Sequence, residues 1–266
     1  MTPQTRTKHD VAADADRLRK LHVPGDPLLL ANVWDPTSAC VVESAGMRAI
    51  ATASNALAPV NGYEDHGHLP PDVAFGALRR ITDAVSLPVT ADLEDGYGLS
   101  PEEFADRLAE AGACGAILED TDHRTHALVD ADRQAKRIAA VKAAAQARGF
   151  DPVINARIDG FFHKAPLEDG LERARKYLAA GADCIYPIFE FDPSALKKYV
   201  ALGPTNALYG PEKLPLGELA KLGVARISVG PMFYRLLMKR LAVATDALRR
   251  LDEQGFGPDW QGGLWK

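Results

Sequence analysis

Three short apolar segments of the sequence end in charged side chains that could act on an acidic substrate. They are residues 87–98, 115–120 and 152–157. The charged ends carry Asp92 with Glu94, then Glu119, then Arg157. In a strand, side chains two positions apart share a face, so Asp92 and Glu94 point the same way. We expect three strands to present acid, acid and base from their carboxyl ends, where parallel α/β proteins place active sites.

The acidic segment predicts a metal site. Asp92, Glu94 and Asp95 fall within four residues, and these carboxylates repel one another unless a cation lies among them. Mg²⁺ takes oxygen ligands, keeps several waters and uses one or two carboxylates, so it fits this spacing, with Mn²⁺ as the alternative. The competing interpretation is a solvated acidic loop or a helix cap. Glu119, expected on a neighbouring strand, favours the metal.

Arg157 predicts that the ligand is an anion. An arginine at the end of an otherwise apolar strand needs a negative partner, and its planar guanidinium matches a carboxylate or a phosphate bidentately. The alternative is an internal ion pair with Glu119 or Glu94. Both arrangements can hold in the free protein.

Two segments on the amino-terminal side of these residues contain further candidates. In Ala51–Ala56 the small side chains would let the backbone N–H groups of Ser54 and Asn55 face a bound anion, although an ordinary turn is an equal alternative. Residues 60–68 are rich in Gly and His, and we expect a lid from which Asp65 reaches the site.

The loop after Glu119 contains two histidines. A surface position is the more ordinary interpretation for both His123 and His126. This loop begins beside the expected metal, however, so His123 is also a candidate to shuttle a proton.

Composition bounds the class of protein. The chain has 266 residues, a net charge of −5 and 47% hydrophobic residues, which suits one α/β barrel domain over residues 1–266. The acidic balance argues against nucleic-acid binding, which rests on clustered Lys and Arg. Three isolated cysteines indicate reduced thiols, and neither a signal peptide nor an apolar run of about 18 residues is found, so we expect a cytoplasmic protein that does not enter a membrane.

Apolar segments alternate with helical patterns along the chain, which predicts an eight-stranded parallel (β/α)8 barrel. The expected strands are 27–33, 47–53, 87–93, 115–119, 152–157, 183–189, 205–208 and 224–229. A doubly wound open sheet is the alternative, but no G-x-G-x-x-G follows the first strand.

Both ends of the chain add to the barrel. Residues 1–25 are expected to form an N-terminal helical segment, and residues 231–266 a C-terminal helix and tail. The apolar positions of 231–251 recur at helical spacing, so this helix needs a partner, either the barrel wall or another subunit. The tail carries Trp260 and Trp265, for which docking in an oligomer and fraying are equal alternatives.

The segments, taken in order, resemble the isocitrate lyase/phosphoenolpyruvate mutase superfamily over nearly the whole chain. The phrases D-x-E-D-G-Y-G at 92–98 and L-E-D at 118–120, with the later A-R at 156–157, carry the resemblance. It implies an α/β barrel whose last helix is exchanged between subunits of a dimer or tetramer. It also implies Mg²⁺, a small 2-oxo or 2-hydroxy carboxylate, and a C–C or C–P bond made or broken through an enolate.

The resemblance also implies roles for charged residues. Asp92 corresponds to the principal metal-site carboxylate, and it also lies among the substrate contacts. Glu94 and Glu119 correspond to its companions, which act largely through metal-bound water. Arg157 corresponds to the clamp on the substrate carboxylate and on the enolate oxygen, and Asp65 to the aspartate of the gating loop.

Uncharged residues complete the implied substrate site. The backbone at Ser54 and Asn55 resembles the carboxylate-binding turn, with the usual serine of the family falling near Ala53. Asn206 is a candidate for a polar contact from the seventh strand. The proton carrier is open among Asp65, His123 and a metal-bound water.

One loop departs from the family pattern. Isocitrate and methylisocitrate lyases carry K-[KR]-C-G-H with a catalytic cysteine after L-E-D, whereas Thr121–Asp130 contains no cysteine. Mutases and phosphonopyruvate hydrolases carry a lysine and an N-S pair there, where this chain has Arg124 and Thr125-His126-Ala127. We therefore expect a Mg²⁺-dependent carbon–carbon lyase. A phosphonopyruvate-type mutase or hydrolase, a non-catalytic 2-oxo acid binder and a metal-dependent aldolase are the alternatives.

Overall fold

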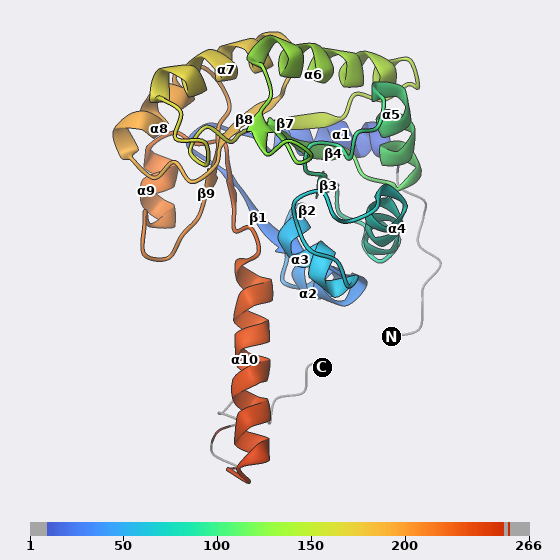
Figure 1. Ribbon diagram of the computed structural model, residues 1–266, viewed down its shortest axis with the longest axis vertical. Coiled ribbons are helices and arrows are strands. Elements are labelled where there is room, and N and C mark those ends of the chain that lie inside the picture. Colours follow the sequence, from blue (N-terminus) through green and yellow to red (C-terminus); the bar gives the residue numbers. More distant parts are fainter. Residues whose placement is uncertain (1–9, 253–254, 256–266) are drawn as a thin grey trace.

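The computed structural model describes residues 10–252 and 255, and eight parallel strands form its centre (Figure 1). They are β1 (Leu28–Val33), β2 (Ile50–Thr52), β3 (Val89–Asp92), β4 (Gly115–Glu119), β7 (Val153–Ile158), β8 (Cys184–Pro187), β9 (Asn206–Leu208) and β10 (Arg226–Ser228). The strands follow the order β8-β7-β4-β3-β2-β1-β10-β9, and a parallel bridge between Ile185 and Thr205 joins the two outer strands. This nearly closed barrel confirms the predicted (β/α)8 fold.

Each barrel strand is followed by at least one helix, and one helix precedes the first strand. The helices are α1 (Val11–Lys20), α2 (Pro36–Ser44), α3 (Ser54–Val60), α4 (Pro71–Thr82), α5 (Pro101–Glu110), α6 (Ala131–Gln146), α7 (Leu167–Ala179), α8 (Pro193–Val200), α9 (Leu216–Lys221) and α10 (Met232–Arg249). None of the helices within the described ranges is long and apolar enough to cross a membrane.

Local sequence signals explain where several helices begin and end. Asp35 caps α2 through the N–H of Ser38, and Ser100 with Glu103 forms a reciprocal capping box at α5. A proline occupies the first turn of both helices, where its missing N–H costs nothing. Glycines such as Gly46, with a φ of +81°, follow the helix ends and turn the chain back towards the sheet.

The extra C-terminal helix α10 leaves the barrel and extends away from it (Figure 1). Only Ala247 of its residues is buried. The side chains of Leu236, Leu237, Leu241 and Leu248 are 51–65% exposed, so the apolar face has no partner within the described part of the chain. The barrel wall, one of the two predicted partners, does not cover this face.

Two elements were not expected from the sequence. Residues 54–60 form the helix α3 rather than an open turn. The loop after β4 contains a two-stranded hairpin, β5 (Thr121–Asp122) and β6 (Ala127–Leu128). The predicted N-terminal helical segment is helical at 11–20, and the tail with Trp260 and Trp265 lies outside the described residues.

Candidate active site

Strand register brings the predicted charged residues to one rim of the barrel. Asp92 at the end of β3 pairs with Ile117 of β4, and Glu119 two positions later pairs with Arg157 of β7. Asp92, Glu119 and Arg157 therefore come from three adjacent parallel strands at their carboxyl ends. Glu94 follows directly after β3, and its carbonyl oxygen accepts the N–H of Glu119 at 3.0 Å. The four predicted charged residues lie together, as their spacing predicted.

Asp92 is held by the first residue of α3. The backbone N–H and the hydroxyl of Ser54 donate to Asp92 Oδ2 at 3.0 and 2.9 Å. The other oxygen, Oδ1, is buried and has no hydrogen-bond partner among the described residues. Burial raises the pKa of Asp92, and Arg157 and Ser54 oppose that rise. The Ser54 N–H, predicted to face a bound anion, is thus directed at this carboxylate.

Glu94 occupies a strained and buried position. Its φ of +51° lies in the left-handed region, which costs about 1–3 kcal/mol for a residue with a side chain and is typical of functional sites. The N–H of Gly67 donates to Oε2, while Oε1 is buried without a partner in the described chain. Burial, with the charges of Asp65 and Asp92, raises the pKa of Glu94 to about 8.

Arg157 is clamped between two carboxylates. It forms ion pairs with Glu119 and with Asp159, whose Oδ1 lies 2.6 Å from Nε. Its side chain is 11% exposed, and the Arg157 Cζ atom lies 5.6 Å from the centre of the Phe162 ring. Burial opposes the charge, but Glu119, Asp159 and Asp92 together raise the pKa of Arg157 well above its usual value. The arginine is a fixed cation, and the expected internal ion pair with Glu119 is present.

His123 belongs to the site and is not a surface residue. Its Nε2 atom lies 2.5 Å from Glu119 Oε1 and 3.5 Å from Glu94 Oε2, and its side chain is 7% exposed. Burial alone would lower the pKa of His123, but these two carboxylates raise it to about 9. His126, in the same loop, is exposed.

The predicted lid residue Asp65 also reaches the site. Asp65 Oδ2 accepts a hydrogen bond from Asn55 Nδ2 at 2.9 Å, and Arg235 at the start of α10 donates to Asn55 Oδ1 at 3.0 Å. The lid, α3 and α10 are thus joined by one chain of polar contacts. Ala53 is buried at the start of α3.

Asn206 lies deeper in the barrel than the rim residues. Its side chain is fully buried, and its amide donates to Ser228 Oγ at 3.3 Å. Ser228 lines the rim cavity, so Asn206 borders the site through that hydroxyl. Its predicted contact with substrate stays a prediction.

A cavity of about 590 Å³ opens at this rim. Its polar lining includes Asn32, Ser54, Asn55, Asp65, Asp92 and Arg157, and an apolar lining stands opposite. A cavity that combines apolar walls with a few convergent charged groups is the usual form of a small-molecule site.

The donor set fits Mg²⁺ held partly through water. Within residues 10–252 and 255, no three His, Cys, Asp or Glu side chains could enclose an ion directly, so Asp92, Glu94 and Glu119 do not form a closed cage. Asp92 Oδ1 and Glu94 Oε1 are nevertheless buried carboxylate oxygens that lack a donor in the described structure. Hard oxygen donors that leave room for several waters are what Mg²⁺ prefers.

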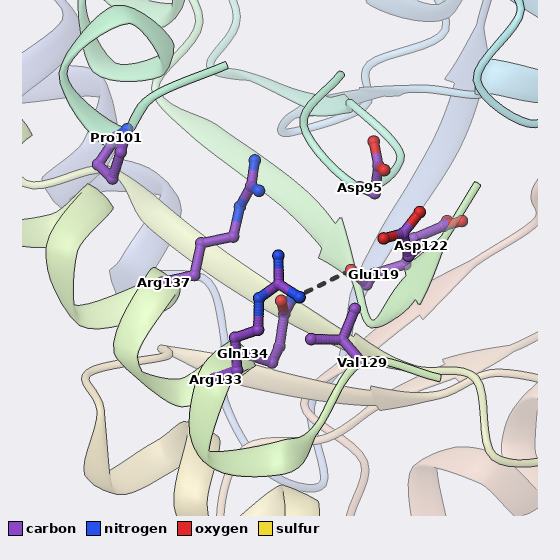
Figure 2. A pocket seen from close by; sticks show the side chains of 8 residues that line it. All are labelled: Asp95, Pro101, Glu119, Asp122, Val129, Arg133, Gln134 and Arg137. Atoms are coloured by element: carbon purple, nitrogen blue, oxygen red, sulfur yellow. Dashed lines mark hydrogen bonds between the residues drawn. The ribbon is translucent and has the colours of Figure 1, made fainter. Parts of the chain in front are cut away.

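A second, smaller cavity of about 190 Å³ lies behind Glu119 (Figure 2). Gln134 of α6 donates to the Glu119 carbonyl oxygen at 3.0 Å and fixes the end of β4. Arg137, also on α6, packs closely against Gly96. A Cβ at residue 96 would collide with the Arg137 guanidinium. The glycine of the D-x-E-D-G phrase therefore makes room for a second arginine behind the loop that contains Glu94 and Asp95.

The sequence reasoning did not identify the residues that hold Arg157 in place. Asp159 accepts from Arg157 and from the Thr121 hydroxyl at 2.7 Å, and its N–H donates to Asp120 Oδ1 at 2.8 Å. Asp120 in turn accepts from Tyr177 at 2.6 Å. The R-x-D spacing of Arg157 and Asp159, two residues on one strand face, could have revealed the first of these contacts.

Known proteins match the chain over most of its length. The Mycobacterium tuberculosis protein Rv1998c, described as uncharacterized, is 33% identical over 218 residues, covering 80% of this chain and 81% of that protein. The 2-methylisocitrate lyase of Salmonella typhimurium is 33% identical over 190 residues, covering 63% of each chain.

Structure and family comparisons agree with these matches. A crystal structure from Burkholderia cenocepacia J2315, provisionally assigned as a phosphonomutase, is 43% identical, has a TM-score of 0.82 and covers 88% of this chain and 99% of its own. The family model for phosphoenolpyruvate phosphomutase matches residues 18–249. These findings confirm the superfamily resemblance, and its known members are enzymes that include lyases and mutases. The chain therefore belongs to the phosphoenolpyruvate phosphomutase family.

Proposed function

We propose that the protein is a Mg²⁺-dependent carbon–carbon lyase that acts on a small 2-oxo or 2-hydroxy carboxylic acid through an enolate. The observation that carries this proposal is the shared cavity wall of Arg157, a fixed cation, and Asp92, a carboxylate with one free oxygen. Such a wall can bind an acid and a metal side by side. Asp92 and Glu94, with Glu119 acting through water, would hold the metal.

The chain's own residues explain how the bond is broken. In a 2-oxo dicarboxylate, the bond from C3 to the departing carboxylate breaks, carbon dioxide leaves, and the electron pair passes through C3 to the C2 oxygen. A proton then joins C3. Arg157 faces the negative charge that develops on this oxygen, and Glu119 and Asp159 keep its guanidinium in position. When bound, Mg²⁺ would act as a Lewis acid on the same oxygen and carboxylate.

In a 2-hydroxy acid, the hydroxyl loses its proton and the bond between C2 and C3 breaks. C2 then becomes an oxo carbon, and the electron pair stays on the departing fragment as an enolate. Asp65 is our proposed proton carrier, because it lines the cavity and its Oδ1 has no partner among the described residues. His123 is the second candidate, although its contacts favour a role in holding Glu119 and Glu94.

The loop after β4 fits neither specialised group of the family, because residues 121–128 form a short hairpin with neither the lysine of the mutases nor the cysteine of the isocitrate lyases. The lyase is preferred because the chain aligns with a 2-methylisocitrate lyase over 190 residues. A phosphonopyruvate-type mutase or hydrolase is the second candidate, and the family model and the Burkholderia structure favour it. A binder of 2-oxo acids without turnover is the third.

The test begins with thermal stability in the presence of 2-oxo and 2-hydroxy di- and tricarboxylates, phosphonopyruvate and oxalate, each with and without Mg²⁺. Ligand binding to the folded state raises the melting temperature, so we expect a shift that needs both acid and metal. Turnover assays on the stabilising acids then separate the candidates. Consumption of phosphonopyruvate would favour the mutase or hydrolase, and stabilisation without product would favour the binder.

Arg157→Lys tests the assigned clamp. A lysine keeps the charge but loses the planar fork, and we expect kcat/KM to fall by about 10²–10³-fold, as when an oxyanion donor is removed. Arg133→Lys, an exposed arginine on the far side of Glu119, is the matched control and should retain activity. Near-normal turnover by a folded Arg157→Lys variant would contradict the mechanism.

We also propose that the protein is a homo-oligomer, a dimer or a tetramer, in which the exposed apolar face of α10 packs on another subunit. Exposed leucines along the helix support this, because a monomer rarely leaves such a continuous stripe in water.

A further inference from the structure

The rim cavity is lined by charged, polar and apolar side chains. Asn32, Asp65 and Asp92 belong to β1 and β3 or to the segment after α3, Arg157 lies on β7, and Glu212 and Lys213 follow β9. A group of apolar side chains, which we call the apolar wall, comes from β8 and β9 and from the segments after β7 and β8. The apolar wall consists of Phe162, Tyr186, Ile188, Phe189, Phe191 and Leu208.

The aromatic part of the apolar wall is ordered. Phe162 and Phe189 meet edge to face with their ring centres 4.9 Å apart, and Phe189 and Phe191 meet at 6.3 Å. Phe189 has a φ of +60°, a conformation that side-chain-bearing residues rarely adopt. Such local strain persists only where the surrounding contacts require it, and it is concentrated at functional sites.

The apolar wall begins at the clamp for the substrate's acid group. The Phe162 ring lies 5.6 Å from the Arg157 guanidinium, yet 49% of Phe162 is exposed. A substrate held by Arg157 would therefore have a half-exposed aromatic ring directly beside it. Burial of apolar surface against such a ring is favourable by about 25 cal/mol per Å².

The cavity is also larger than a small acid needs. A four-carbon hydroxy-dicarboxylate has roughly nine non-hydrogen atoms, and at about 30 Å³ each, the share of one water in the liquid, it would fill less than half of the cavity volume. The cavity volume of about 590 Å³ would leave the apolar wall uncovered by such a substrate.

From these observations we infer that the substrate carries an apolar substituent of about four or more carbons on the carbon next to C2, lying along the apolar wall. The inference rests on the proposed function, because it assumes that Arg157 binds the acid group. It names the substrate class as a 2-oxo or 2-hydroxy acid with an alkyl or arylalkyl side chain.

Binding is measured first, because it does not depend on turnover. Calorimetric Kd values with Mg²⁺ are compared for the 2-oxo monocarboxylates pyruvate, 2-oxobutanoate, 2-oxohexanoate and phenylpyruvate. Each added methylene should lower Kd about three- to fourfold, the transfer value for one buried CH₂ group. Equal Kd values along the series, or tightest binding by pyruvate, would overturn the inference and leave the proposed function standing.

Turnover is measured second, on 2-oxo and 2-hydroxy dicarboxylates that carry hydrogen, methyl, butyl or benzyl next to C2. The butyl and benzyl acids should show the highest kcat/KM. If Kd falls along the series as expected but no acid is cleaved, the proposed lyase function is wrong, while the inferred apolar binding site remains supported. If the unsubstituted acid is cleaved fastest, the inferred substrate class is wrong.

Phe191→Ala tests the apolar wall itself, at the end away from Arg157. We expect a loss of at least tenfold in the preference for phenylpyruvate over pyruvate. Phe161→Ala is the matched control, because Phe161 is a 64% exposed neighbour that contacts Phe189 and does not line the cavity. If Phe161→Ala lost as much of this preference as Phe191→Ala, the loss would not depend on a position in the cavity lining. The apolar wall would then pack against a lid or a second subunit, and the inference would be overturned.

Discussion

His22, just after α1, is a half-buried histidine whose charge the fold opposes. Its Nδ1 atom lies 2.8 Å from the Leu18 carbonyl oxygen, so this nitrogen donates and Nε2 would take up any added proton. Burial and the nearby Arg226 guanidinium, which is itself fully buried, lower the pKa of His22 from 6.5 to about 4. The folded state therefore favours the neutral form of the His22 imidazole.

This shift predicts a pH dependence of stability. Between pH 6.5 and pH 4 the unfolded chain binds a proton that the folded protein does not, so the free energy of unfolding falls as pH falls through this window. The contribution of His22 to the free energy of unfolding is fully present above pH 6.5 and is on the order of 3 kcal/mol. Chemical denaturation at pH 7.5 and pH 4.5 should show a smaller loss for His22→Leu than for the wild type.

The control for this comparison is His126→Asn, which changes an exposed histidine with a positive φ to a residue that tolerates that conformation. It should keep the wild-type pH dependence. If His22→Leu lost as much stability on acidification as the wild type, the assigned role of His22 would be wrong.

Within residues 60–68, the segment predicted to form a lid, one glycine lies in close contact with two residues of the site. Gly67 has a φ of +82°, its N–H donates to Glu94, and a Cβ there would lie 2.8 Å from His123 Cβ. Gly67→Ala should therefore push the loop away from the site. We expect faster proteolysis of this loop. In the presence of Mg²⁺, at least a tenfold higher concentration of the acid should be needed for the same rise in melting temperature.

Gly62→Ala is a matched control within the same loop. Gly62 has nearly the same φ, +83°, but no atom lies within 4 Å of where its Cβ would be. Both variants carry the cost of a positive φ, about 1 kcal/mol. Only Gly67→Ala adds a collision, so equal proteolysis rates in the two variants would contradict the proposed contact.

At this scale the sequence predicted some elements better than others. The eight strands were predictable because they are short apolar runs, most of which follow a glycine near the end of a helix. Asp92, Glu119 and Arg157 lie at or next to the carboxyl ends of their strands as predicted, whereas Glu94 lies beyond β3 in a left-handed conformation that a strand spacing of two does not describe. The helix α3 was not, because Ala51–Ala56 has no polar cap and Pro59 lies inside the helix. The buried position of His123 depends on a glycine 56 residues earlier in the chain, and no local pattern encodes such a contact.

Within the described residues, the apolar face of α10 is a long uncovered surface. Leu237→Glu with Leu241→Glu places two charges on this face, where the side chains are 51% and 57% exposed. If the proposed assembly is right, burying these charges between subunits is unfavourable, and the mass measured by sedimentation should fall towards that of one chain.

The polar face of the same helix supplies the control. Lys239→Glu adds a negative charge nearly opposite Leu237 and Leu241, because two residues along a helix correspond to about 200°. This variant should keep the parental mass. An unchanged mass for the double leucine variant would show that α10 does not hold the subunits together.

The first turn of α10 connects this apolar face to the candidate active site. Tyr234 packs against Trp34 with ring centres 5.3 Å apart, and Arg235 bonds Asn55, which in turn bonds Asp65. The helix has 18 residues, and the part beyond that anchor, residues 236–249, is about 21 Å long. If α10 packs on another subunit as proposed, that contact would also fix Arg235 and, through Asn55, Asp65. Dilution into single chains would then free these residues and lower the rate of turnover.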